Sequence, residues 1–290
     1  MITRLLFRFV LYPLSHLPLW LLYIKGYLFY LVARYMMRYR SKVIDYNLHI
    51  AFPNKSKREL KKIKNRYYIH LSEIAVEMLK MLTINKKELK ERYLCTCPEK
   101  VNRYFDENRS VILVSSHYNN WEWMVLALNL MFKHSGVGVG APNSNKDFET
   151  MVNRARTRYG TSVVFADTIR EEFERREQEK CPTAYMMLSD QSPPHPDRSY
   201  HTLFFKHPSG VIFGAEHYAK KYNFPVIYYE VIKEKRGYYR VHLDLITDEP
   251  RHTAHGEITE AYLRRLEKVI KEKPEYWLWS HRRWKHEIKI

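Results

Sequence analysis

From about residue 93 to the C-terminus, short β-rich runs alternate with stretches of helical periodicity, and this alternation is what most constrains the fold. The runs are "SVILVSS", "GVGVGAP", "TSVVFA", "TAYMML", "HTLFF", "PVIYYEVI" and "YYRVHLDLI". Most of them are separated by helical patterns near 120–134, 146–159, 168–179, 211–222 and 255–273. Such alternation predicts an α/β domain with a mixed, largely buried sheet flanked by helices. The last two runs, split around Gly237, predict an antiparallel hairpin.

Two helices are predicted ahead of this region. Residues 41–52 have the pattern of a short helix that ends before Pro53. A long helix follows within 54–81, where Ser56 and Glu59 have the spacing of a capping box. Apolar residues recur along it at steps of three or four, which predicts one buried face. They are Leu60, Ile63, Tyr67, Leu71, Ile74, Met78 and Leu82.

Residues 1–38 form an apolar N-terminal segment, and residues 39–290 are predicted to form one domain. From Leu14 to Ala33 the only formal charge is Lys25. Because about 20 apolar residues cross the hydrocarbon core of a bilayer, we predict a hydrophobic membrane-anchor helix that spans the membrane or embeds deeply in its interface. A buried core helix is the alternative. Basic residues follow the segment directly and predict that the remainder of the chain is cytoplasmic.

The charge balance predicts a negatively charged partner. Lysine and arginine outnumber aspartate and glutamate by 49 to 32, for a net charge of +17. Nucleic acid, an anionic membrane surface or acidic ligands would be attracted. The sequence has no helix-turn-helix, zinc-finger or RNP motif, so nucleic acid is not expected. Three cysteines, Cys95, Cys97 and Cys181, form no disulfide framework and indicate a reducing compartment.

The stretch "VILVSSHYNNWEW" at 111–123 carries the candidate chemistry. A buried strand ends there, and open α/β sheets bind ligands at the carboxyl ends of their strands. Asn119 or Asn120 can cap the following helix, whose first turn contains Glu122. The spacing predicts that His117 and Glu122 meet, so that the carboxylate orients a histidine acting as a general base. A structural histidine beside a solvated glutamate is the alternative.

The same stretch also carries a family resemblance. "HYNNWE" resembles the H-x4-D/E motif of the glycerolipid acyltransferase superfamily, and its "NWE" form is similar to that of the bacterial lipid A biosynthesis (late) acyltransferase family. Further parts of the family pattern follow in order along nearly the whole chain. They are Tyr39-Arg40 with Asn47 and Phe52-Pro53, "APN" from Ala141, "RARTRYG" around Arg156, "DQ" at Asp190-Gln191, and "WLWSHRRWK" from Trp277 to Lys285. Each motif alone is weak, whereas their order and spacing together are specific.

The resemblance implies an O-acyltransferase with a glycerolipid acyltransferase-like fold. A fatty acyl group would pass from a thioester of acyl carrier protein or coenzyme A to a hydroxyl of a membrane glycolipid, with a lipid A precursor as the expected acceptor in lipopolysaccharide biosynthesis. The expected place is the bacterial inner membrane, with the catalytic domain on its cytoplasmic side. No metal and no cofactor are expected.

The resemblance also implies roles for individual residues. His117 corresponds to the general base and Glu122 to its orienting partner. Arg158, with Arg156 as the near alternative, would contact an anionic group of the acceptor or donor. The implied substrate-binding residues are Arg158, Arg156, Asp190 and Asn120.

Three other functions stay open from the sequence. The acceptor could be another membrane lipid, such as a phosphoglycolipid or an aminolipid. The protein could instead be a non-enzymatic basic protein that binds membranes. A metal-dependent hydrolase is the third, and its ligands would come from His117, Glu122, Asp190 and one of His195 or His201.

Overall fold

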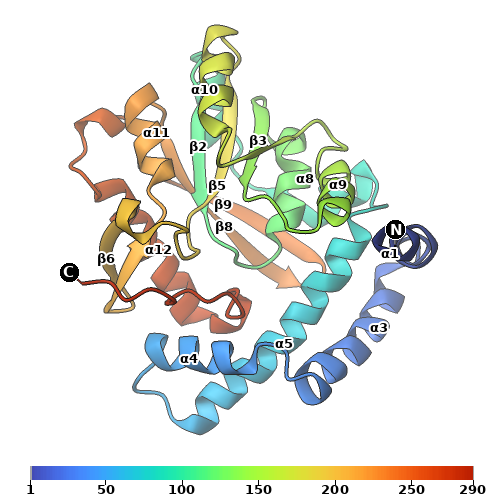
Figure 1. Ribbon diagram of the computed structural model, residues 1–290. Helices are drawn as coiled ribbons and strands as arrows, with labels where there is room; N and C mark the ends of the chain where they lie inside the picture. Colours follow the sequence, from blue (N-terminus) through green and yellow to red (C-terminus); the bar gives the residue numbers. More distant parts are fainter. Residues whose placement is uncertain (1, 290) are drawn as a thin grey trace.

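The computed structural model describes residues 2–289 and confirms an α/β fold built on a mixed sheet (Figure 1). Seven strands form the main sheet in the order β1-β9-β8-β2-β5-β3-β4. Every neighbouring pair is parallel except β8 and β9, which form the predicted antiparallel hairpin. The strands are β1 (Tyr93–Cys95), β2 (Val111–Ser115), β3 (Ser135–Gly140), β4 (Ser162–Phe165), β5 (Thr183–Leu188), β8 (Val226–Lys235) and β9 (Tyr238–Thr247).

Helices cover both faces of this sheet. The helices of the α/β region are α6 (Lys86–Arg92), α7 (Glu99–Asp106), α8 (Trp121–Met131), α9 (Lys146–Arg156), α10 (Ile169–Gln178), α11 (Gly214–Tyr222) and α12 (Glu257–Glu272). Successive residues of β2 point to opposite faces, so Ile112 and Val114 share one core with α11 and α12, whereas Val111 and Leu113 share the other with α8. Short 3-10 turns at Pro196–Arg198, Pro250–His252 and Pro274–Tyr276 complete the connections.

The run "HTLFF" lies outside the main sheet. It becomes β6 (Tyr200–Phe204), which pairs with β7 (His207–Val211) in a separate two-stranded antiparallel hairpin. Phe205 and Lys206 connect the two strands with φ of 54° and 59°. Both positive φ values match a type I′ turn, the connection that suits the twist of a tight hairpin.

The apolar N-terminal segment is divided into short helices rather than one long one. They are α1 (Ile2–Leu6), a π-helical turn at Phe7–Leu11, α2 (Tyr12–Ser15), α3 (Leu19–Leu31) and a second π-helical turn at Val32–Met36. Pro18 precedes α3 in an extended conformation and so separates it from α2. Within residues 2–289 no helix combines the length and apolarity needed to cross a bilayer, so the predicted spanning helix is wrong.

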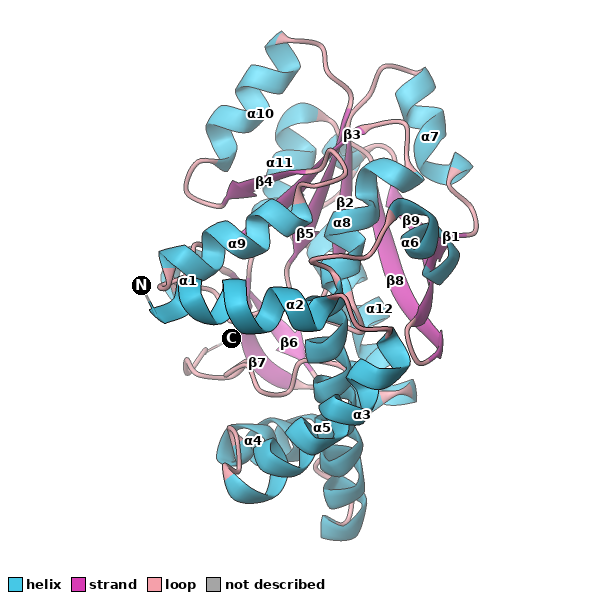
Figure 2. Cartoon of the chain, turned by 90° about the vertical axis from the view of Figure 1, so that its right-hand side faces the viewer, coloured by secondary structure: helices cyan, strands magenta, loops and turns pink. Residues whose placement is uncertain are grey.

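Helix α3 packs along α5 (Lys57–Lys80), as Figures 1 and 2 both show. A Cβ on Gly26 would lie 2.6 Å from a methyl carbon of Val76, so this close approach needs glycine. The predicted capping box at the start of α5 is confirmed, since Ser56 and Glu59 each bond the other's backbone N–H. The short helix before it is α4 (Ser41–Ala51). The contact between α3 and α5 attaches the N-terminal helices to the remainder of the protein.

Candidate active site

His117 lies in the loop between β2 and α8, at the carboxyl end of a central strand. The predicted cap of α8 is Asn120, whose side-chain oxygen accepts the backbone N–H of Trp123 at 2.9 Å. Asn119 adopts a φ of 55°, a left-handed conformation that asparagine tolerates well. The loop is therefore a tight turn that presents His117 beside the sheet.

Asp190 is the carboxylate that contacts His117. It follows β5, which is paired in parallel with β2, and this pairing brings the ends of the two strands together. Its Oδ1 lies 2.8 Å from Nδ1 of His117, and its Oδ2 accepts the backbone N–H of His117 at 3.1 Å. Trp277 donates its Nε1–H to the same Oδ2 at 2.8 Å.

The electrostatics keep Asp190 ionised. Burial alone raises the pKa of this carboxyl, but the charge of His117 and the hydrogen bonds from His117 and Trp277 outweigh burial and hold the pKa below its ordinary value. An ionised carboxylate can only accept, so Nδ1 of His117 carries the hydrogen. The lone pair of the neutral ring is then on Nε2, where a general base needs it.

The Nε2 side of the ring faces a glutamine and a tryptophan. Nε2 of Gln191 lies 3.2 Å from Nε2 of His117. The Trp121 ring meets the imidazole edge-on, with centroids 5.1 Å apart. The His117 side chain keeps 18% of its surface exposed, so a substrate group can reach it from solvent.

The predicted contact between His117 and Glu122 is not formed. Both oxygens of Glu122 are held by Arg156, whose Nε and Nη2 lie at 2.7 and 2.6 Å, and Trp121 donates to Oε1 at 3.1 Å. The first turn of α8 aims Glu122 towards α9 rather than back over the loop. The structure thus makes Asp190, and not Glu122, the hydrogen-bond partner of His117.

Arg158 points away from this group of residues. Its guanidinium donates to the carbonyl oxygens of Leu82 at 2.7 Å and Met81 at 3.1 Å, and also to that of Ile84. These carbonyls belong to the connection between α5 and α6, so Arg158 holds a turn. Of the two candidate arginines, Arg156 is the one that the structure joins to the residues around His117.

Asn120 connects the His117 loop to a buried glutamate that the sequence reasoning missed. Its Nδ2 donates to Oε2 of Glu77 at 2.7 Å, so both ends of the Asn120 amide have protein partners. Glu77 is fully buried and also accepts the hydroxyls of Tyr23 and Tyr239, each at 2.7 Å. Burial raises the pKa of Glu77 above its ordinary value. In the sequence, Glu77 lies between Ile74 and Met78 on the helix face that the apolar periodicity predicts to be buried. That position was the signal that Glu77 is not an ordinary surface glutamate.

The C-terminal segment fixes the other side of the loop. Asn119 donates its backbone N–H to the carbonyl of Tyr276 at 3.0 Å, and the N–H of Leu278 reaches the carbonyl of His117 at 3.1 Å. Together with the contact between Trp277 and Asp190, these bonds attach residues 276–278 to both members of the pair. The motif "WLWSHRRWK" therefore supports the site through its backbone and one indole.

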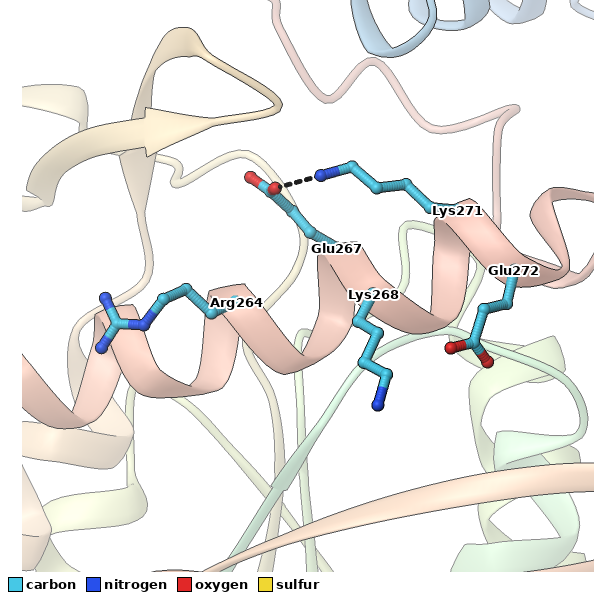
Figure 3. A pocket seen from close by; sticks show the side chains of 5 residues that line it. All are labelled: Arg264, Glu267, Lys268, Lys271 and Glu272. Atoms are coloured by element: carbon cyan, nitrogen blue, oxygen red, sulfur yellow. Dashed lines mark hydrogen bonds and ion pairs between the residues drawn. The ribbon is translucent and has the colours of Figure 1, made fainter.

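Two other features do not make a competing site. The hollow on the outer side of α12 is lined by Arg264, Glu267, Lys268, Lys271 and Glu272 (Figure 3). None of these described side chains has a hydrogen bond or ion pair with His117 or Asp190. Over the described residues, no group of three or more His, Cys, Asp or Glu side chains is placed to hold a metal ion.

Comparison with known proteins identifies the family. The family model described as bacterial lipid A biosynthesis acyltransferase matches residues 6–286. No curated protein matches the chain. Because the family match covers nearly the whole chain, the protein belongs to the bacterial lipid A biosynthesis acyltransferase family and is an acyltransferase.

Proposed function

We propose that the protein moves a fatty acyl group from an acyl thioester of acyl carrier protein or coenzyme A to a hydroxyl of a membrane glycolipid, with a lipid A precursor as the acceptor. The observation that carries the proposal is the contact between His117 and Asp190 at the carboxyl end of the sheet. A histidine with its Nδ1–H held by a buried carboxylate is a general base suited to a hydroxyl.

The reaction follows from the lone pair on Nε2. The acceptor hydroxyl attacks the thioester carbonyl while Nε2 of His117 takes its proton, and the carbonyl electrons move to oxygen. Asp190 stays ionised and balances the imidazolium that forms. Collapse of the tetrahedral intermediate re-forms the carbonyl and expels the thiolate, which takes the proton back from Nε2. The products are an ester and a thiol, and no metal or cofactor takes part.

The charge of the chain supports an acidic donor and an anionic acceptor. With a net charge of +17, the protein attracts acyl carrier protein, coenzyme A and anionic lipids. Arg156 is ion-paired with Glu122, and Glu122 accepts the indole N–H of Trp121 beside His117, so Arg156 is the candidate arginine that is joined to the site. This supports a contact between Arg156 and an anionic group of a substrate.

We also propose that the N-terminal helices lie in the interface of the bacterial inner membrane, with the α/β region on the cytoplasmic side. Large apolar side chains are exposed along these helices to an extent seen at few other described positions. They include Phe9 at 66%, Trp20 at 65%, Ile24 at 61%, Leu28 at 64% and Met36 at 78%. An exposed apolar helical surface of this kind embeds in the boundary between headgroups and acyl chains.

The test is comparative lipid mass spectrometry of cells that carry the wild-type protein, no protein, or His117→Ala. We expect one acyl chain to be missing from a lipid A species in the second and third strains. A missing chain on a phosphoglycolipid or an aminolipid would reassign the acceptor. Lipid profiles that are identical in all three strains would reject the proposed function.

A further inference from the structure

Asp190 and Gln191 are consecutive residues, and they contact the two opposite nitrogens of one imidazole. Asp190 holds Nδ1 at 2.8 Å, and Gln191 places its amide nitrogen 3.2 Å from Nε2. Because Asp190 fixes the hydrogen on Nδ1, the Nε2 atom presents a lone pair, and the amide –NH₂ is the part of Gln191 that can bond to it. The catalytic lone pair is therefore occupied by a donor from the protein itself.

We propose that Gln191 caps the catalytic base: its amide occupies Nε2 of His117 until the acceptor hydroxyl displaces it, and this keeps His117 from activating water against the thioester. The identity of the displacing hydroxyl rests on the proposed function. The capping contact itself rests on the geometry alone.

The cap is built to be displaced. Among the residues that the structure describes, His117 is the single hydrogen-bond partner of the Gln191 side chain, and this side chain is partly exposed. Asp190, by contrast, is buried and accepts three donors. One residue of the pair is therefore fixed and its neighbour is free to turn aside when another donor reaches Nε2.

The cap favours a lipid acceptor over water for an energetic reason. A water molecule that displaces the amide from Nε2 replaces one hydrogen bond with one other and so gains nothing. The amide also competes well with water for Nε2, because its attachment to the chain gives it a high local concentration. A lipid acceptor brings binding energy from the remainder of its surface, and that energy can be used to turn the amide aside. With water as the nucleophile, His117 takes one proton, the thiolate recovers it, and the acyl chain is lost as a free fatty acid.

The first experiment probes the cap without any acyl substrate. Diethyl pyrocarbonate modifies neutral imidazole nitrogen, and mass spectrometry of peptides gives the rate at His117 relative to that at His252, whose side chain is 82% exposed. In the full-length protein, Gln191→Ala should raise this relative rate by about 5- to 10-fold, because one hydrogen bond is worth about 1–1.4 kcal/mol. An unchanged rate would overturn the proposal.

The second experiment measures how acyl-coenzyme A is divided between hydrolysis and transfer to the acceptor. We expect Gln191→Ala to raise the ratio of hydrolysis to transfer by about the same factor, and Gln191→Leu to raise it less because the side chain still fills the space. Adding His117→Ala to Gln191→Ala should abolish the hydrolysis. The matched control is Gln178→Ala, at the exposed end of α10 and the only other glutamine of the sequence.

The outcomes separate the two proposals. A ratio that does not change, or equal losses of hydrolysis and transfer in Gln191→Ala, would overturn the cap and leave the acyltransferase function in place. A wild-type protein that transfers no acyl group from either thioester would reject the proposed function, while the diethyl pyrocarbonate result would still decide whether Gln191 shields His117.

Discussion

Asp190 holds His117 at two points, through Nδ1 of the ring at 2.8 Å and through the backbone N–H at 3.1 Å. One carboxylate thus sets the position of the loop as well as the tautomer and orientation of the imidazole. Trp277 adds a third donor, which leaves the carboxylate little freedom to turn away. The pair is therefore pre-organised before any substrate binds.

The first prediction concerns this pair. Asp190→Asn should lower kcat/KM by about 10⁴-fold, because an amide can present the wrong group to Nδ1 and cannot balance the imidazolium. His117→Ala should remove nearly all transfer. The double variant should be hardly worse than His117→Ala, because residues that act as a unit fail together. Steady-state kinetics at equal concentrations of folded protein measure all three.

Glu122→Gln is the informative comparison for that series. Its oxygens bind Arg156 and Trp121, so we expect it to lower stability and to reduce kcat/KM far less than Asp190→Asn does. A larger loss in Glu122→Gln than in Asp190→Asn would make Glu122 the functional partner of His117 after all.

The second prediction assigns different roles to two nearby arginines. Arg158→Met should lower the free energy of unfolding by about 1–3 kcal/mol without changing KM, because the carbonyls in the turn after α5 lose their donors. Arg156→Met should lower it by about 3–5 kcal/mol, because Glu122 is left buried without its partner. Urea unfolding and kinetics of each variant provide the two readouts.

Arg154→Met is the matched control, since Arg154 lies on α9 like Arg156 but is exposed. We expect it to change neither the free energy of unfolding nor KM. If Arg158→Met raised KM while its unfolding curve stayed that of the wild type, Arg158 would be a substrate contact instead.

The third prediction tests the membrane surface. Replacing Ile24 and Leu28 together with glutamate should release much of the protein from anionic vesicles, because both side chains are exposed and would have to carry charge into the interface. Leu203→Glu, at a comparably exposed leucine on β6, should leave binding unchanged. Vesicle co-sedimentation measures the bound fraction, and equal binding by all variants would exclude this face.

Point substitutions are a better test of this surface than removal of residues 1–38. The amine of Lys80 donates to the carbonyl of Leu17 at 3.1 Å, and the hydroxyl of Tyr23 bonds to the buried Glu77. A truncated chain would leave the buried amine of Lys80 without its carbonyl partners and would remove one of the three donors to Glu77. Its behaviour on vesicles would then reflect damage to the domain as well as loss of the apolar surface.

The fourth prediction concerns acid stability. Burial lowers the pKa of His134 from its ordinary 6.5 to about 4, and Nδ1 of this histidine has no partner among the described residues. The unfolded chain takes up a proton near pH 6.5, whereas the folded protein does so only near pH 4. The contribution of neutral, buried His134 to the free energy of unfolding is therefore complete above pH 6.5 and is lost as the pH falls towards 4. It amounts to about 3 kcal/mol.

Urea unfolding of the wild type and His134→Gln between pH 7 and pH 4.5 tests this account. Stability of the wild type should decline across the window, and the decline should be shallower in the variant. Parallel curves would contradict it. Burial also lowers the pKa values of His70 and His281 to about 4, so part of the decline should persist in His134→Gln.

The sequence predicted those features that depend on local pattern. The strand at 111–115, the turn with asparagines and the cap at Asn120 all follow from residue types within one short stretch. The contact between His117 and Asp190 depends on β2 and β5 being neighbours in the sheet, although β3 and β4 lie between them in the chain. No local pattern gives that strand order, so Glu122, five residues from His117, was the nearer choice.

The N-terminal segment and Arg158 also differ from what the sequence predicts. The apolar content of residues 14–33 fits a spanning helix, but the backbone at Pro18 separates α2 from α3, and Gly26 lets α3 approach α5 closely. Arg158 lies in a basic stretch where sequence alone cannot tell an anion contact from a bond to backbone carbonyls. The packing of α3 on α5 and the contacts of Arg158 depend on tertiary structure, which composition and periodicity do not encode, whereas the break at Pro18 is a local signal.

The attachment of residues 276–278 to the His117 loop ties the active site to the order of protein synthesis. The last strand of the sheet ends at Thr247, about thirty residues before this segment emerges from the ribosome. The loop that carries His117 is therefore completed only after residues 276–278 have been made and have docked on it, although both members of the pair come from much earlier in the chain.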